Sequence, residues 1–410
     1  MLQDSVLLGI LFLILAFVFY TSEGSNQRWK SFYQYVPPTL VCYFLPSLIN
    51  SFGWVNQTNS QLYSVVSKVL LPACLVLFTL SVDFKAVSKL GSKALLLFAT
   101  SALSVMIGGP IAVWLVLMVS PETVGGQGAD AVWRGLATLA GTWIGGGANQ
   151  TALREVFQPS DRLFSAILTI DTFTSNIWLA ILLYGAGVSK RIDRFLKADA
   201  SAIDDVQRRI EHQQAAQTRV PTVPELIYIC AVGFGATAVA HFLADHIAPY
   251  IGQHSPLLSK FSLNAPFFLV VSIATGIGIG LSFTKVRNLD GAGGSKIATV
   301  FLYLMITTIG LKMDVLAIFD NPGLIAVGFL WLFVHAALML LVCWLTKSPF
   351  FFLAVGSQAC IGGPATAPVI AAAFHPALAP VGVILAILGY AVGTYLGYLC
   401  GIFMQMVVAP

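Results

Sequence analysis

The sequence predicts an all-α polytopic membrane protein made of two inverted repeats, with about ten transmembrane helices and two re-entrant glycine-rich hairpins. First, the 410 residues are 57% hydrophobic and only 10% charged, whereas soluble domains carry about 25% charged residues. Second, the mean hydropathy is +0.83, and apolar runs extend from one end of the chain to the other. Third, two similar glycine motifs interrupt apolar segments at corresponding places in the two halves.

Apolar segments separated by polar stretches define the expected helices. In the first half they lie at 5–21, 36–53, 61–82, 94–120, 131–157 and 163–189. In the second half they lie at 224–251, 266–282, 297–316, 325–346, 351–376 and 379–408. We therefore expect a first repeat at 1–189 with its hairpin at 131–157, and a second repeat at 224–410 with its hairpin at 351–376. The charged stretch 190–223 is the expected cytoplasmic linker, and contact with anionic lipid is an alternative role for its basic part.

The two halves resemble each other in more than hydropathy. Residues 79–87 (TLSVDFKAV) end the third apolar segment of the first half, and residues 308–316 (TIGLKMDVL) end that of the second. A glycine motif then falls in the fifth segment of each half. This common order and spacing indicates an internal duplication.

The basic residues predict the orientation of the chain. Lys and Arg gather in loops at 22–35, 83–93, 190–223, 283–296 and 347–350, which the positive-inside rule places in the cytoplasm. These loops share one side only if each hairpin enters and leaves the membrane on the same face. Each half then crosses an odd number of times, so the second repeat is inverted and the N- and C-termini lie outside. No basic flank or cleavage site surrounds the first apolar run, which favours an uncleaved helix.

The first glycine motif reads IGGGAN at 144–149. Consecutive glycines break a helix and free backbone polar groups, which a bilayer tolerates only where protein or water satisfies them. The helix that follows points N–H groups at an anion, and freed carbonyl oxygens suit a sodium ion. Tight packing through small residues is the alternative, but the recurrence of the motif favours a functional break. The candidate solute ligands of this break are Gly145, Gly146, Gly147, Asn149 and Gln150.

The second motif reads IGGPAT at 361–366 and is followed by a second proline at position 368. Two prolines at this spacing cannot both continue a regular helix, so the chain is expected to unwind here. The candidate solute ligands of this break are Gly362, Gly363 and Thr366.

Asp171 lies well inside the sixth apolar segment, where a carboxylate is costly and marks a functional site by default. It could hold sodium or accept a proton, and a role in helix packing is the alternative. Hydroxyl and amide side chains follow it at 172 and 174–176. The candidate ion ligands are Asp171, Thr172, Thr174, Asn149, Ser357 and Gln358.

Three further features have plainer interpretations. His335, in the middle of an apolar segment, is more often a hydrogen-bonded packing residue than a proton carrier. His241, Asp245 and His246 lie near a helix end, and too few ligands accompany them to favour a metal site over a solvated end. No GxSxG, HExxH or GKS/GKT motif is present, so neither an enzyme nor a cofactor is expected.

Glycine-rich breaks at inverted-repeat positions resemble those of the sodium/glutamate and 2-hydroxycarboxylate symporters. The runs GTWIGGGAN at 141–149 and GGPATAP at 362–368 are more closely similar to the YjcL-like family of poorly characterised bacterial membrane proteins, and this similarity covers nearly the whole chain. It implies a bacterial cytoplasmic (inner) membrane protein, an inverted-repeat fold, a scaffold domain that dimerises and a mobile domain that carries the hairpins. Ala148 and Ala365 depart from the GGxG motif of the symporters, so the resemblance does not carry over a substrate.

We therefore expect a secondary active transporter that carries a small organic anion or an amino-acid-like solute by alternating access. Sodium-coupled symport is favoured, with sodium as the only expected bound ion. A proton-coupled transporter or antiporter that uses Asp171 is the alternative, and a membrane-embedded enzyme using Asp171 and His335 is a third. The expected partners are the solute, the lipid bilayer and a second copy of the chain, and no nucleic acid.

Overall fold

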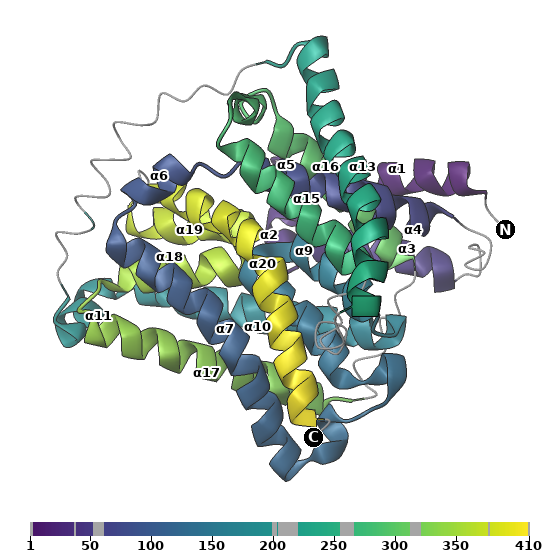
Figure 1. Ribbon diagram of the computed structural model, residues 1–410. Coiled ribbons are helices and arrows are strands. Elements are labelled where there is room, and N and C mark those ends of the chain that lie inside the picture. Colours follow the sequence, from purple (N-terminus) through teal and green to yellow (C-terminus); the bar gives the residue numbers. More distant parts are fainter. Residues whose placement is uncertain are drawn as a thin grey trace.

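A computed structural model describes residues 3–36, 38–51, 61–198, 203, 220–254, 266–311, 321–375 and 378–408. In these residues all regular structure is helical, and every apolar segment expected from the sequence falls on a helix (Figure 1). Of the expected linker 190–223, the structure describes residues 190–198, 203 and 220–223. It describes the expected segment 297–316 as far as residue 311.

In the first half, α1 spans Asp4–Glu23, α2 Gln27–Tyr35, α3 Pro38–Ser51, α4 Leu62–Val65 and α5 Leu71–Leu80, with a π-helical turn at Val66–Leu70 between the last two. It continues with α6 at Phe84–Lys89, α7 at Ser92–Val119, α8 at Pro121–Val124, α9 at Val132–Phe157, α10 at Asp161–Gly187 and α11 at Ser189–Leu196. In the second half, α13 spans Val223–His254, α15 Pro266–Ser282, α16 Gly294–Gly310, α17 Gly323–Leu345, α18 Phe350–Ile361, α19 Gly363–Phe374 and α20 Ala379–Val408.

Seven helices of the described chain are long and apolar enough to cross a membrane. They are Asp4–Glu23, Leu62–Leu80, Ser92–Val119, Asp161–Gly187, Val223–His254, Gly323–Leu345 and Ala379–Val408. Shorter apolar helices occur at Pro266–Ser282, Gly294–Gly310 and Phe350–Ile361. The protein is thus a multi-pass membrane protein, and the number of about ten crossings stays a prediction.

Helix α9 folds back on itself at Gly146, which has a positive φ of 77° and a non-helical ψ. A Cβ on Gly141 would lie 2.9 Å from the carbonyl oxygen of Asn149, whereas eight residues of continuous helix rise about 12 Å. The two ends of α9 also meet, because the rings of Trp133 and Phe157 lie 5.5 Å apart. Residues 132–157 therefore form a helical hairpin with Gly146 at its tip.

Helices α18 and α19 form a second hairpin. Its tip is Gly362 and Gly363, and Gly363 has a positive φ of 62°. The ends meet again through aromatic side chains, since the rings of Phe351 and Phe374 lie 5.2 Å apart. Asp193 of α11 fastens the base, because its Oδ1 accepts a hydrogen bond of 2.7 Å from the backbone N–H of Phe350.

The long helix α20 supports the first hairpin through glycines that let the two backbones touch. A Cβ on Gly393 would lie 2.7 Å from Cα of Gly145, and one on Gly397 would lie 3.1 Å from Cα of Gly141. Such close approach is available only to small residues. The tip of the first hairpin is thus held by backbone packing rather than by long side chains.

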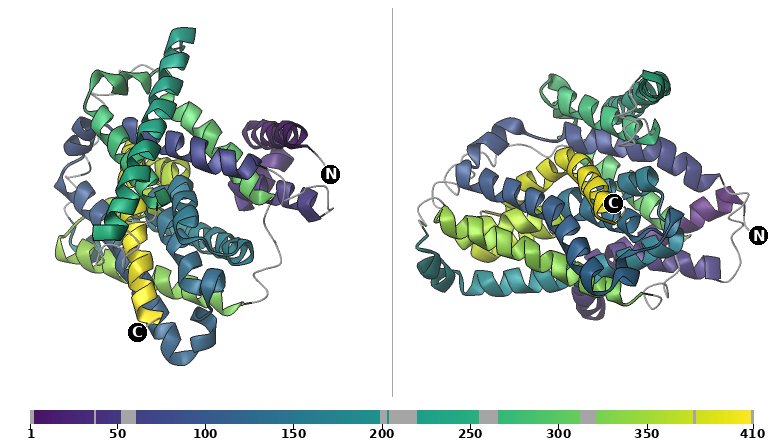
Figure 2. Two further views of the ribbon diagram at one scale, coloured as in Figure 1. Left: turned by 45° about the vertical axis from the view of Figure 1, so that its right-hand side comes forward. Right: turned by 60° about the horizontal axis from the view of Figure 1, so that its bottom comes forward.

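Two groups of helices make up the molecule, and each has its own apolar core. The first group consists of α1, α3, α5, α13, α15 and α16. The second consists of α7, α9, α10, α17, α18, α19 and α20. In Figure 1 the first group occupies the upper right and the second the lower left, and Figure 2 shows the same division from two other directions. Each group draws helices from both halves of the chain.

Packing partners are exchanged between the halves. Helix α5, the third expected segment of the first half, packs on α15, the second expected segment of the second half. In the same way α16, the third segment of the second half, packs on α3, the second segment of the first half. Helix α20 packs on the first hairpin, and α10 packs on the second. Helices α7 and α17, the fourth segments, pack on each other.

Candidate functional site

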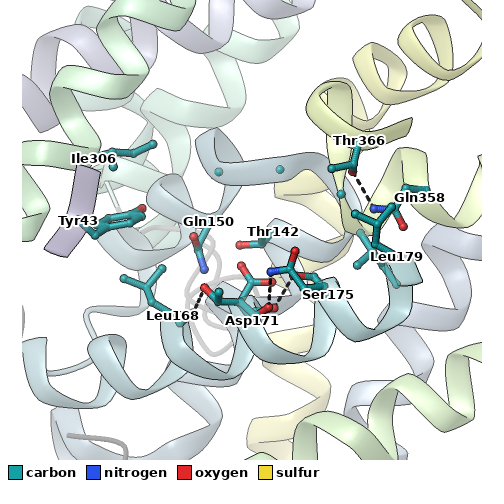
Figure 3. A pocket seen from close by; sticks show the side chains of 16 residues that line it. Tyr43, Thr142, Gln150, Leu168, Asp171, Ser175, Leu179, Ile306, Gln358 and Thr366 are labelled. Atoms are coloured by element: carbon teal, nitrogen blue, oxygen red, sulfur yellow. Dashed lines mark hydrogen bonds between the residues drawn. The ribbon is translucent and has the colours of Figure 1, made fainter. Parts of the chain in front are cut away.

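A cavity of about 210 Å³ lies where the tips of both hairpins meet the first group of helices (Figure 3). A cavity of about 150 Å³ holds a benzene-sized molecule, so this one has room for a small organic solute. Its wall is formed by Tyr43, Thr142, Gly146, Gly147, Gln150, Leu168, Asp171, Thr172, Ser175, Asn176, Leu179, Ile306, Gln358, Ile361, Gly362 and Thr366.

Asp171 provides the only carboxylate among these lining residues. The indole Nε1 of Trp143, on the first arm of the first hairpin, donates a hydrogen bond of 2.9 Å to its Oδ1. This charge-assisted bond fixes one oxygen of the carboxylate and ties α10 to the hairpin. Figure 3 shows Asp171 beside Thr142 and Ser175 on the cavity wall.

The polar side chains after Asp171 bind the backbone of their own helix. Ser175 Oγ donates to the carbonyl oxygen of Asp171 at 2.5 Å, and Asn176 Nδ2 donates to that of Thr172 at 2.7 Å. Donation to the preceding turn is the usual way for a hydroxyl or amide to sit inside an apolar helix. It leaves their oxygen lone pairs available to a ligand in the cavity.

Two glutamines on the wall carry buried amide atoms that have no hydrogen-bond partner among the described residues: Nε2 of Gln150 and Oε1 of Gln358. Their side chains are 2% and 1% exposed. Nε2 of Gln358 donates to Oγ1 of Thr366 at 2.7 Å, across the two arms of the second hairpin. Buried polar atoms are rarely left unpaired, because each such atom costs about 1–3 kcal/mol. Both atoms are therefore suited to a solute or a coordinated ion.

The cavity brings together many of the residues predicted from the sequence. Gly146, Gly147, Gln150, Gly362, Thr366, Asp171, Thr172 and Gln358 line it. Gly145, Gly363, Asn149, Thr174 and Ser357 do not.

The amide of Asn149 is used inside the protein. Its Nδ2 donates to the carbonyl oxygen of Gly145 at 2.7 Å, and its Oδ1 accepts a hydrogen bond of 2.5 Å from Thr394 on α20. Asn149 therefore closes the turn of the first hairpin and fastens it to α20. Thr174 is likewise turned inward, where it donates to the carbonyl oxygen of Ile170 at 2.7 Å.

Ser357 belongs to a buried network around His335. Trp178 Nε1 donates to Ser357 Oγ at 2.8 Å, Ser357 Oγ lies 2.8 Å from His335 Nε2, and His335 Nδ1 lies 2.7 Å from Ser104 Oγ. Because Ser104 donates in turn to the carbonyl oxygen of Ser101, a neutral imidazole with its proton on Nδ1 satisfies every partner. The network ties the second hairpin to α7, α10 and α17.

Tyr43 of α3 and Ile306 of α16 form the opposite wall, which the sequence does not predict. Both lie in uniformly apolar segments, where no local pattern distinguishes them. Four further lining residues are not predicted as ligands from the sequence: Thr142, Leu168, Leu179 and Ile361. Thr142 directly precedes the first glycine motif, so its position was the one available signal.

The histidines of α13 bind backbone carbonyls rather than one another. His241 Nε2 lies 2.8 Å from the carbonyl oxygen of Lys68, and His246 Nδ1 lies 2.7 Å from that of Phe242. Within the described residues no group of three or more His, Cys, Asp or Glu side chains could hold a metal ion.

The fold and the cavity define a multi-pass helical membrane protein with a polar site at the tips of two helical hairpins. Over residues 9–407 the chain matches the family described as "Protein of unknown function (DUF819)", and it belongs to that family. It is also similar to the "Uncharacterized membrane protein YjcL" of Bacillus subtilis (strain 168), with 22% identity over 398 residues that cover 93% of this chain and 92% of the relative.

Proposed function

We propose that the protein is a secondary active transporter, and that the cavity at the hairpin tips is its solute site. One observation carries this proposal: both broken helices meet in one cavity, where the buried Gln150 and Gln358 each offer an unpartnered amide atom. Broken helices that face each other near the middle of a membrane are the usual solute site of secondary transporters.

The exchange of packing partners supports a duplicated and inverted chain with repeats at 1–189 and 224–410. A two-fold axis in the membrane plane would relate α5 to α16, α15 to α3, and α20 with the first hairpin to α10 with the second. On this proposal both hairpins are re-entrant, the membrane is crossed about ten times, and the basic loops face the cytoplasm.

The contact between the two groups is suited to alternating access. Ala148 and Ala152 of the first hairpin pack into the core of the first group, and Phe78 of α5 stacks on Tyr390 of α20 with ring centroids 4.2 Å apart. Small and flat apolar side chains can slide without breaking hydrogen bonds. The first group would then be the scaffold, dimerising with a second copy, while the second group moves and carries the solute.

Asp171 supports coupling to a cation. A sodium ion prefers oxygen ligands, and the Asp171 carboxylate has Thr142, Thr172 and Ser175 as neighbours on the wall. We propose sodium-coupled symport of a small organic anion or an amino-acid-like solute in a bacterial cytoplasmic membrane. Proton coupling through Asp171 is the second candidate, because a single carboxylate can carry a proton in the same way.

Purified protein in proteoliposomes tests the proposal. We expect uptake of radiolabelled small carboxylates or amino acids when a sodium gradient is imposed, and little uptake when choline replaces sodium. Gln150→Ala should reduce uptake strongly, whereas Gln253→Ala, at an exposed position of α13, should not. Uptake that follows a pH gradient and ignores sodium would support the proton-coupled candidate. Failure of every solute to be transported under either gradient would refute transport.

A further inference from the structure

We infer that the cavity admits solutes with a single carboxylate, that is, monocarboxylates and amino acids without an acidic side chain, and that it excludes solutes with two carboxylates. This inference rests on the proposed transport function and narrows the class of solute. It separates the protein from carriers of acidic amino acids or of dicarboxylates and tricarboxylates.

The charges on the cavity wall limit the number of carboxylates that a solute can bring. Among the described lining residues Asp171 is negative, and none is Lys, Arg or His. A solute with two carboxylates would therefore enter a small, partly apolar space that already holds a carboxylate and offers no basic side chain. Like charges a few ångströms apart in such a space repel strongly.

The basic side chain on the next turn of α9 does not offset the negative charge of Asp171. Arg154 lies one helical turn beyond Gln150, but its Nη2 pairs with Asp161 at 2.5 Å and its Nη1 lies 3.4 Å from Glu155. Tyr63 contacts the same cluster through hydrogen bonds to Arg154 and Glu155. The guanidinium charge is therefore already compensated by two carboxylates.

The uncharged polar groups at the cavity suit one carboxylate group. The second arm of the first hairpin begins at Gly147, which lines the cavity, and α19 begins directly after Gly362, which also lines it, so two helix N-termini with their partial positive charge lie at the cavity. Gln150 Nε2 adds an unpartnered, buried donor beside them. Together these groups can bind one carboxylate, and a cation at Asp171 would balance the site.

The rest of the wall supports the same solute class. Leu168, Leu179, Ile306 and Ile361 present apolar surface, and Gln358 Oε1 is an unpartnered acceptor that suits a hydroxyl, amide or ammonium donor. A molecule with one carboxylate, one donor group and a short side chain would satisfy both glutamines.

Matched pairs of solutes that differ by one carboxylate test the inference. The pairs are glutamine with glutamate, asparagine with aspartate, and lactate with malate, each measured by thermal shift and by uptake into sodium-free proteoliposomes placed in a sodium buffer. We expect the first member of at least one pair to bind, and its acidic partner to bind at least about 100-fold more weakly, because the second carboxylate has no basic side chain to balance it in a cavity that already holds Asp171. Binding of an acidic member as tight as that of its partner would overturn the charge limit while leaving transport intact.

A substitution that should allow acidic solutes to bind makes the test more specific. Gln358→Lys adds one positive charge to the wall and should allow the acidic members to bind, whereas Gln253→Lys adds the same charge at an exposed site and should not. If Gln358→Lys does not fold, Asp171→Asn removes the negative charge of the wall, and the preference within each pair, measured by thermal shift without sodium, should be smaller than in the parent. An unchanged preference in a folded variant would contradict the inference. If no solute of either kind binds or is taken up, both the inference and the transport function are refuted.

Discussion

At the scale of single residues, the structure explains how a carboxylate can lie inside an apolar helix. Asp171 is not paired with a basic residue in the described chain; Trp143 donates one hydrogen bond to it, and the rest of the carboxylate borders a polar cavity. An isolated buried charge costs several kcal/mol, so a carboxylate in this position favours a ligand that brings positive charge. Packing alone would be served better by an apolar residue of similar size.

Asp171→Asn should remove the response of the protein to sodium. Asn keeps the shape and one oxygen that Trp143 can contact, but it removes the charge that would lower the cost of a dehydrated cation. A ligand at 100 times its Kd stabilises the folded state by about 2.7 kcal/mol, so the parent should melt at a higher temperature in sodium than in choline. The variant should lose most of that difference.

Asp245→Asn is the matched control, because Asp245 is exposed on α13. It should keep the sodium response of the parent. A parent whose melting temperature depends on pH but not on sodium, with that dependence lost in Asp171→Asn, would indicate proton coupling. Equal sodium and pH responses in Asp171→Asn and the parent would make Asp171 a structural residue.

At the scale of helices, the two glycine tips are constrained by backbone conformation rather than by space. A Cβ on Gly146 would meet only a Tyr390 ring atom at 3.6 Å, and a Cβ on Gly363 would meet nothing within 4 Å. Both residues nevertheless have a positive φ, which costs a residue with a side chain about 1–2 kcal/mol. The substitution to alanine thus tests conformation without a steric clash.

Gly146→Ala and Gly363→Ala should each lower the free energy of unfolding by about 1–2 kcal/mol and reduce uptake much more than this loss of folded protein explains. The reason is that a change of φ at the tip reorients the N–H groups that face the cavity. Gly235→Ala, at an exposed position of α13 with ordinary φ and open space, should change neither property. The role assigned to the tips would be wrong if both tip variants transported like the parent.

Hydropathy could locate the helices because each one buries its backbone polar groups within a single segment. The expected 94–120 is α7 at Ser92–Val119, and the expected 325–346 is α17 at Gly323–Leu345. The glycine motifs also predicted where the two helices break. The rotation of each helix about its axis could not be predicted, because long-range packing sets it. For this reason the sequence does not predict that Asn149 binds Thr394 or that Tyr43 lines the cavity.

At the scale of the whole molecule, the two groups of helices touch through a largely apolar face. It includes a hydrogen bond of 2.9 Å from the Tyr395 hydroxyl of α20 to the carbonyl oxygen of Ser272 on α15, and it ends in a polar cluster. Arg154 and Glu155 belong to the first hairpin, and Tyr63 of α4, on the side of the first group, binds both. Arg154 also lies 4.9 Å from the centroid of the Tyr63 ring. If the groups slide past each other during transport, these hydrogen bonds must break.

Tyr63→Phe should loosen the contact between the groups, because it removes the hydroxyl and keeps the ring under Arg154. A cysteine at position 152, buried where the hairpin meets the first group, reports on this in a protein without its native cysteines. Losing about 1 kcal/mol should raise its rate of thiol labelling about fivefold. Tyr33→Phe, which removes a hydrogen bond of 2.8 Å to Thr21 within the first group, should leave the rate unchanged. Equal labelling in the two variants would show that the Tyr63 cluster does not hold the groups together.

The inverted repeat makes a prediction about the two faces of the membrane. Each hairpin closes at its own base, with Trp133 against Phe157 in one and Phe351 against Phe374 in the other. If the repeats are inverted, the two bases must lie on opposite faces, since the same hairpin is then inserted from opposite directions.

Single cysteines at Ala129 and His375, both exposed beside a hairpin base, report on these two faces. The six native cysteines would be removed first; five are buried, and Cys230 is half-buried. In intact cells a membrane-impermeant thiol reagent should label the cysteine at 129 and reach the one at 375 only after the membrane is opened, because the basic loops place the first base outside. The reverse pattern would keep the inversion and correct the orientation. Labelling of both positions from one side would mean that the two hairpins enter from the same face, and the duplicated, inverted architecture would have to be abandoned.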